Sequence, residues 1–288
     1  KNNMSLPIRK IIEKTDIPKA FFIGNEYKLM PEKLRFINKL KFNLVFSQTN
    51  NLKVHKLYKN FVKANVVWSP NCLIDKKIFN CKMNHAKRLI DIGYRSYASP
   101  PYTGNNERVQ IAKYFKDFSS KKGLISDISL KHEDRFSPEE YSLFLNNCKF
   151  QLGTEAGTDY FELTDKTRYE VNSYLENKEV NWSEIYEIFF KNKKDKIPLR
   201  IITGRNLEAA ACGTVQILFE GEYNGFLKPD IHYIRLKKDF SNINEVEEKM
   251  NDNHLLKEIR KNCFNLVNST FKDEIILKNI YKVLLIYI

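Results

Sequence analysis

The chain has 288 residues, of which 42% are hydrophobic and 13% aromatic, a composition typical of folded proteins and not of disordered ones. This length exceeds that of a usual single domain, so we expect two domains. The net charge of +13 suggests anionic partners, but the basic residues form no stripe with interleaved aromatic residues, which argues against a nucleic-acid-binding protein. The remaining anionic partners are a nucleotide diphosphate or the acidic face of a membrane.

The cysteines and histidines show no spacing that binds a metal or builds a disulfide framework. The five cysteines are odd in number and widely separated, and no pair has the C-x-x-C pattern. They are typical of reduced thiols in a cytoplasmic protein, so we expect no disulfide, no metal and no cofactor. The apolar segment 280–288 is too short to span a membrane, and the chain starts at Lys1 without the pattern of a signal peptide. We expect a cytoplasmic protein, with contact to the inner face of the plasma membrane as an open alternative; whether Lys1 is the true N-terminus also stays open.

Short apolar segments alternate with amphipathic ones in the first part of the chain. We predict strands at residues 20–23, 43–47 and 65–70, and helices at 31–40 and 52–61. Such alternation is typical of a parallel sheet with helices on both faces. We assign residues 1–85 to a Rossmann-like domain that is short for this fold, and expect its opening strands to be truncated or absent.

A second alternating unit starts near residue 86. Strands are predicted at 88–94, 124–130, 149–152 and 215–219, and helices at 107–118, from Ser137 to Cys148, and within 243–270. We assign residues 86–270 to a second Rossmann-like domain with a mostly helical insertion at 160–198, and expect a final helix in 271–288 to pack across the joint. Because open α/β sheets bind ligands at the carboxyl edge, the loops at 95–104, 153–159 and 203–206 are predicted to form one cleft.

The segment 203–217 carries the strongest chemical signal. We predict a loop, a short Ala-rich helix with Glu208 in its first turn, a stop at Gly213 and a buried strand. A lone carboxylate among small residues in a buried helix needs a partner, and the two hydroxyls of a ribose can both donate to it. The alternative is an ordinary helix-to-strand turn in which Glu208 interacts with the helix dipole.

The segment from Glu208 to Gly213 resembles the Glu-Ala-x-Ala-Cys-Gly element in the C-terminal domain of GT-B glycosyltransferases. Residues 219–225, 229–234 and 236–242 extend the match and resemble the spore-protein (CgeB/YkvP-like) branch of that family. The resemblance covers roughly the C-terminal two thirds of the chain. It implies two Rossmann-like domains that transfer a sugar from a nucleotide diphosphate sugar to a polysaccharide, lipid-linked or protein acceptor without a metal ion.

The resemblance also implies roles for single residues. Glu208 would accept the ribose hydroxyls, and Arg205 and Asn206, at a helix N-terminus, would hold diphosphate oxygens. Further donor-binding candidates are Arg95, Gly104, Gly157, Thr158 and Tyr223, with Glu155 as a sugar contact or catalytic group. For the arginines, exposed surface positions are the alternative.

An inverting transfer needs a general base, and Glu26, which follows the first strand, is the candidate in the first domain. An ordinary strand-end Glu is the alternative. The first domain is short for this fold, and the sequence identifies no further candidate base in it. The chain could therefore also be a non-catalytic nucleotide- or glycan-binding protein.

Overall fold

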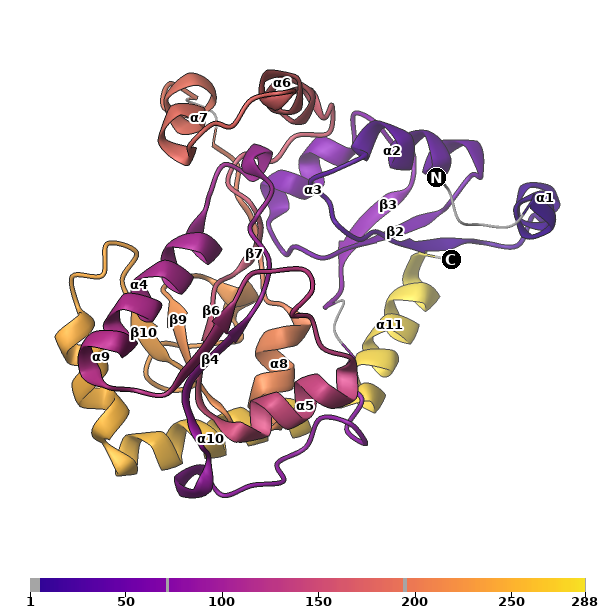
Figure 1. Ribbon diagram of the computed structural model, residues 1–288. Helices are drawn as coiled ribbons and strands as arrows, with labels where there is room; N and C mark the ends of the chain where they lie inside the picture. The colour runs from indigo at the N-terminus through magenta and orange to yellow at the C-terminus, as the bar shows by residue number, and fades with distance from the viewer. Residues whose placement is uncertain (1–5, 71–72, 194–195, 288) are drawn as a thin grey trace.

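A computed structural model describes residues 6–70, 73–193 and 196–287, and shows two lobes of unequal size (Figure 1). The smaller lobe holds a parallel sheet in the order β1-β2-β3, and this confirms the three strands expected in the first part of the chain. The central strand is buried at every position because it carries Leu44, Val45 and Phe46 between its two neighbours. The elements of this lobe are α1 (Leu6–Lys14), β1 (Ala20–Phe22), α2 (Met30–Lys39), β2 (Leu44–Ser47), α3 (Leu52–Tyr58) and β3 (Asn65–Trp68).

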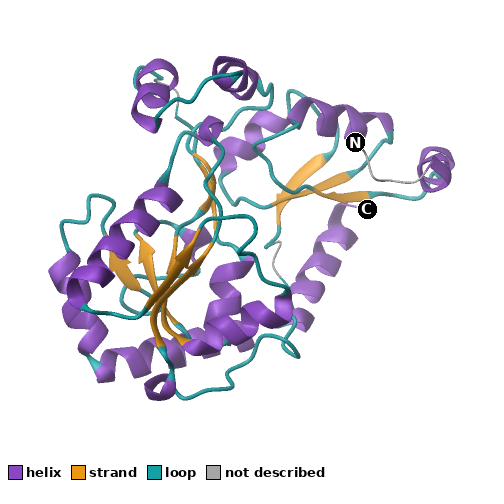
Figure 2. Ribbon diagram, viewed as in Figure 1, coloured by secondary structure: helices purple, strands orange, loops and turns teal. Residues whose placement is uncertain are grey.

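The larger lobe holds a five-stranded parallel sheet in the order β10-β9-β6-β4-β5, with helices on both faces (Figure 2). Helices α4 and α9 cover one face, and α5 and α8 cover the other (Figure 1). Its strands are β4 (Ile90–Arg95), β5 (Ser126–Ser129), β6 (Cys148–Gly153), β9 (Val215–Phe219) and β10 (Ile234–Leu236). Its helices are α4 (Glu107–Lys122), α5 (Pro138–Asn147), α8 (Gly204–Ala211), α9 (Ile243–Asn251) and α10 (Asn253–Asn268), with 3-10 turns η1 (His85–Lys87), η2 (Pro101–Thr103) and η3 (Tyr223–Gly225).

Local sequence signals explain where two of the helices start. Helix α5 has the predicted capping box, in which Ser137 accepts from the Glu140 N–H and the Glu140 carboxylate accepts from the Ser137 N–H at 2.8 Å. Helix α8 starts at Gly204, because the Thr203 side chain accepts from the N–H of Asn206. The prediction that Glu208 lies in the first turn was therefore wrong, since the helix begins earlier and Glu208 falls in the second turn.

The base of the segment 160–198 is an antiparallel ribbon of β7 (Ala156–Thr158) and β8 (Leu199–Ile201), where the sequence suggested a loop. The segment contains α6 (Lys166–Leu175) and α7 (Trp182–Phe189). Phe161 and Leu163 share one buried cluster with Met30 and Tyr58 of the smaller lobe. The hydrophobic core of the smaller lobe is therefore completed by residues that come more than a hundred positions later.

Helix α11 (Asp273–Tyr287) runs from the larger lobe to the smaller one (Figure 1). Ile276 belongs to the core of the larger lobe, whereas Tyr287 lines a surface hollow together with Phe42 and Phe61 of the smaller lobe. The domain limits at residues 85 and 270 stay predictions.

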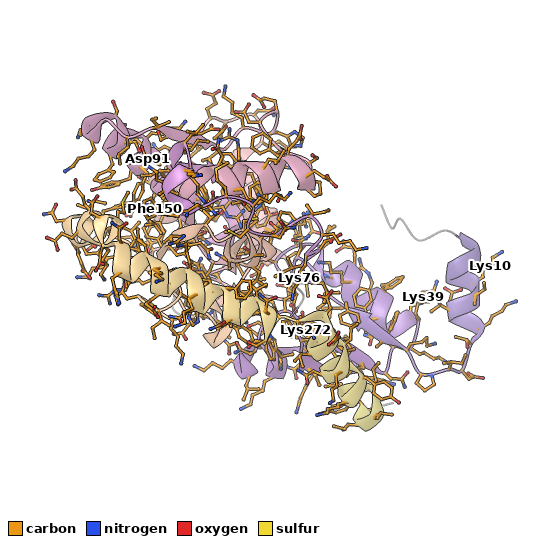
Figure 3. The ribbon with its side chains drawn as sticks, turned by 90° about the horizontal axis from the view of Figure 1, so that it is seen from below. Lys10, Lys39, Lys76, Asp91, Phe150 and Lys272 are labelled. Carbon is orange, nitrogen blue, oxygen red and sulfur yellow. The ribbon has the colours of Figure 1, made fainter. Side chains whose placement is uncertain are left out.

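Positive charge is spread over the surface, as the sequence suggested. Seen from below, Lys10, Lys39, Lys76 and Lys272 lie on separate segments of the chain (Figure 3). The described cysteines, at positions 81, 148, 212 and 263, are free thiols, and Cys72 lies outside the described residues. Within the described ranges, no helix combines the length and the apolar character that crossing a bilayer requires.

Candidate functional site

A cavity of about 470 Å³ lies between the two lobes at the carboxyl ends of β4 and β6. In chain order, the sheet grows from β4 outward to β5 on one side and to β6, β9 and β10 on the other. The strand order therefore reverses between β4 and β6, and open α/β sheets bind ligands at such a switch point. The smaller lobe contributes Asn25, Tyr27 and Gln48 to the wall.

Glu208 lines this cavity from the second turn of α8. Its carboxylate forms no hydrogen bond or ion pair with any residue that the structure describes, although the neighbouring residues 209–211 are buried. Burial raises the pKa of Glu208, and the charge of Arg205 opposes this shift. The carboxylate is therefore a free acceptor that faces the cavity.

Two arginines in the cavity wall have no carboxylate partner among the described residues. The Arg108 guanidinium lies 4.5 Å from the centre of the Tyr97 ring, and the Arg205 guanidinium lies 4.4 Å from that of Tyr141. Aromatic rings hold these guanidinium groups in place without neutralising their charge. The cavity therefore offers two positive charges to an anion.

A side cavity of about 130 Å³ adjoins the main one and is lined by Arg95, Arg135 and Arg205. Arg95 differs from the other arginines because its guanidinium pairs with the Asp127 carboxylate at 2.6 Å. Its charge is compensated within the protein, so a role in binding an anion is weaker for Arg95 than for Arg205.

Tyr97 stands where the lobes meet and lines both cavities. Burial alone would raise the pKa of Tyr97, but the hydrogen bond and the charge of Arg108 outweigh it and lower this pKa. Tyr27 of the smaller lobe is its neighbour, and burial together with Tyr97 raises the pKa of Tyr27. The contact between Tyr27 and Tyr97 therefore links the two lobes next to Arg108.

The floor of the cavity is polar. Gln151 of β6 and Gln216 of β9 are paired in register and are almost fully buried. The Asn206 Nδ2 donates to Gln216 Oε1 at 3.1 Å, and this assigns Gln216 Nε2 as a donor. That nitrogen and Gln151 Oε1 have no hydrogen-bond partner among the described residues. The floor therefore offers one hydrogen-bond donor and one acceptor to a ligand.

The two carboxylates predicted from the sequence as catalytic do not line the main cavity. Glu155 lines a separate hollow of about 10 Å³, which shares Tyr27, Tyr97 and Arg108 with the main cavity. Glu26 is fully buried, and its carboxylate accepts from the N–H of Gln48 at 2.6 Å and from Tyr58 Oη at 2.5 Å. Glu155 accepts from the N–H of Tyr223 at 2.6 Å. Burial raises the pKa of both carboxyl groups. This geometry gives them structural contacts in place of the exposure that a general base needs.

Four predicted donor contacts also lie away from the main cavity. A Cβ on Gly157 would lie 1.8 Å from the Leu199 carbonyl oxygen, so this glycine is required by the pairing of β7 with β8. A Cβ on Gly104 would meet the Tyr160 ring at 2.5 Å. Thr158 Oγ1 donates to the carbonyl of Thr103, and Tyr223 Oη to that of Phe219. Packing explains these four residues without a ligand.

The structure thus brings Arg205, Asn206 and Glu208 together in the main cavity, with Arg95 beside it. Sequence reasoning missed Arg108, although one signal was present. Arg108 lies in the first turn of α4, where a cation is unfavourable near the positive end of the helix dipole unless an anion binds there. Tyr97, Gln151 and Gln216 carried no comparable signal.

No protein-family model matches the chain, and no curated protein matches it. Several solved structures match the chain. TarM matches with a TM-score of 0.55 and 13% identity over 92% of this chain and 50% of its own. HepE from Anabaena in complex with UDP matches with a TM-score of 0.52 and 12% identity, over 93% of this chain and 72% of its own. The complex of HepE with UDP-glucose matches with a TM-score of 0.51.

These structural neighbours are GT-B glycosyltransferases. The predicted α/β fold with Rossmann-like parallel sheets of the GT-B type is therefore confirmed. The chain spans half the length of TarM, and membership of the CgeB/YkvP-like branch stays a prediction.

Proposed function

We propose that the protein is a glycosyltransferase that binds a nucleotide diphosphate sugar in the cavity between its lobes. The observation that carries this proposal is that the unbonded Glu208 carboxylate lines the same cavity as Arg108 and Arg205, two arginines that form no ion pair with a described carboxylate. A vicinal diol and a diphosphate are the complementary groups, and a nucleotide sugar contains both. The crystals of HepE with UDP and UDP-glucose hold ligands of this class in a similar fold.

In the proposed complex, Glu208 accepts the ribose hydroxyls, while Arg108 and Arg205 face the diphosphate. The acceptor oxygen forms a bond to the anomeric carbon of the sugar while the bond from that carbon to the diphosphate breaks. The leaving diphosphate takes the electron pair and gains negative charge, and one of its oxygens then accepts the proton that the acceptor hydroxyl loses. The two guanidinium groups stabilise that charge, so the proposed mechanism needs no metal ion. Asn25, Tyr27 and Gln48 of the smaller lobe then face the acceptor.

Glu208 is the only acidic side chain among the described residues that line the main cavity. This favours a reaction in which no carboxylate of the protein removes the acceptor proton. It also gives some support to the second candidate function, a non-catalytic nucleotide- or glycan-binding protein.

The acceptor in this proposal is a polysaccharide, a lipid-linked glycan or a protein. We also propose a cytoplasmic location, based on the free thiols, and a peripheral contact with an acidic membrane surface, based on the net charge of +13.

Calorimetric titration with UDP, GDP and CMP tests donor binding. We expect micromolar affinity for one nucleotide with weak dependence on salt, and turnover of the matching sugar nucleotide. Glu208→Ala should abolish both, whereas Glu248→Ala, an exposed carboxylate on α9, should change neither. Binding without turnover by the unaltered protein would favour the non-catalytic candidate. Steeply salt-dependent binding of any polyanion would favour a nucleic-acid-binding protein.

A further inference from the structure

We propose that Asn224 is a positioning residue that fixes the distance between the two walls of the cavity. This inference rests on the proposed function, because it assigns one wall to the donor and the other to the acceptor. Asn224 lies in the turn η3 after β9, is 7% exposed and does not line the cavity.

The side chain of Asn224 connects the two lobes by hydrogen bonds. Its Oδ1 accepts from the N–H of Ile202 at 2.7 Å, and its Nδ2 donates to the Gln48 carbonyl at 3.4 Å and to Asn50 Oδ1 at 3.3 Å. The Asn50 amide returns a bond to the Asn224 carbonyl at 3.3 Å. The unambiguous Ile202 N–H donor fixes the orientation of the amide.

The two ends of this connection belong to opposite walls of the cavity. Gln48 lies on the wall of the smaller lobe, and Ile202 immediately precedes Thr203, the residue that caps α8. Because α8 carries Glu208, the Asn224 amide links the position of the ribose-binding helix to that of the acceptor wall. The rings of Trp68 and Phe226 stack with their centroids 5.7 Å apart, and this contact also connects the two lobes.

The turn that carries Asn224 is unusual and is held by buried contacts. Tyr223, Asn224 and Gly225 have φ values of 43°, 55° and 81°, so three consecutive residues adopt the left-handed region. Such a conformation persists only where the surroundings enforce it. Here Glu155 accepts from the Tyr223 N–H at 2.6 Å, which gives this buried carboxylate a role in holding the turn.

A nucleotide that contacts only the larger lobe should bind whether or not the lobes are correctly spaced. Transfer requires both walls and depends steeply on their separation. A positioning role therefore predicts that loss of the Asn224 side chain lowers kcat while the affinity for the nucleotide is retained.

Asn224→Gly tests this prediction, because glycine keeps the left-handed backbone and removes only the side chain. We expect kcat to fall about tenfold with the nucleotide Kd unchanged within about twofold. Asn224→Asp should lose activity to a similar degree, since it keeps the acceptor for Ile202 but places an oxygen against the Gln48 carbonyl. Asn177→Gly is the matched control, because Asn177 has a φ of 62° in an exposed loop.

Hydrogen exchange of the Ile202 amide provides a readout that does not require the proposed activity. It should accelerate in Asn224→Gly and stay unchanged in Asn177→Gly. Unchanged exchange, or a kcat equal to that of the control, would overturn the proposal, as would a fall in nucleotide affinity that accounts for all of the lost activity. If the unaltered protein turns over no sugar nucleotide, the proposed function fails, while exchange still decides the role of Asn224.

Discussion

Glu208 shows how a single residue can indicate a site. Its neighbours at 209–211 are buried alanines that let α8 pack closely on the sheet, so Glu208 is the one charged group in the second turn of this helix. A half-buried carboxylate without a protein partner is costly unless a ligand uses it. This position was predictable from the sequence, because the contrast between one acid and several small residues is local.

The affinity for the nucleotide should depend on the ionisation of Glu208. Burial raises the pKa of this carboxyl group in the free protein, and only the ionised form accepts both ribose hydroxyls. Affinity should therefore rise with pH through that raised pKa and be lost below it. Titration of UDP between about pH 8 and about pH 5 checks this. Subtracting the same series for Glu208→Gln removes the contribution of phosphate ionisation, and identical pH profiles for both proteins would contradict the prediction.

Arg108 and Arg95 should respond differently to the same substitution. Arg108→Met removes an uncompensated charge from the cavity, so UDP should bind about tenfold to a hundredfold more weakly with little loss of stability. Arg95→Met leaves Asp127 without its partner and should mainly lower the unfolding temperature. Calorimetry and thermal unfolding of both variants separate the two effects; equal losses of affinity would refute the distinction.

At the scale of elements, long segments were more predictable than short ones. The strands β2, β6 and β9 and the helices α4 and α5 follow patterns that extend over several residues. The ribbon of β7 and β8 was missed because β7 has the sequence Ala-Gly-Thr, without an apolar run, and its partner strand lies about 40 positions away. Gly157 was read as a phosphate contact for the same reason: a strand that needs glycine looks like a loop in the sequence.

Gly157→Ala should destabilise the protein by at least about 3 kcal/mol, since the new Cβ would collide with the Leu199 carbonyl in a left-handed backbone. Gly123→Ala is the control that measures only the cost of placing alanine at a positive φ. Gly123 has a φ of 64° with no atom near its missing Cβ, so the expected cost is about 1 kcal/mol. Urea unfolding measures both. If both substitutions lower the free energy of unfolding equally, the contact with Leu199 does not add to the cost at Gly157.

At the scale of the whole molecule, the lobes are not independent units. The smaller lobe was expected to be incomplete from its own sequence, yet Phe161, Leu163 and Leu199 enter its core from the later segment. No periodic pattern in the sequence encodes a contact between residues so far apart. The same holds for the Asn224 contacts, so the sequence predicted the two sheets but not these side-chain contacts between them.

Asp165 makes this connection testable. Its carboxylate is 1% exposed and accepts from the N–H of Leu29 at 2.6 Å and of Met30 at 3.1 Å, which start α2 in the smaller lobe. Asp165→Ala leaves these donors and Arg168 unpaired and should cost about 2–4 kcal/mol. Glu170→Ala, in an exposed pair with Lys166, should cost less than about 0.5 kcal/mol. Because residues of the later segment complete the core of the smaller lobe, urea should unfold Asp165→Ala in a single transition that fluorescence and circular dichroism report together. Two separate transitions would show that the lobes fold independently.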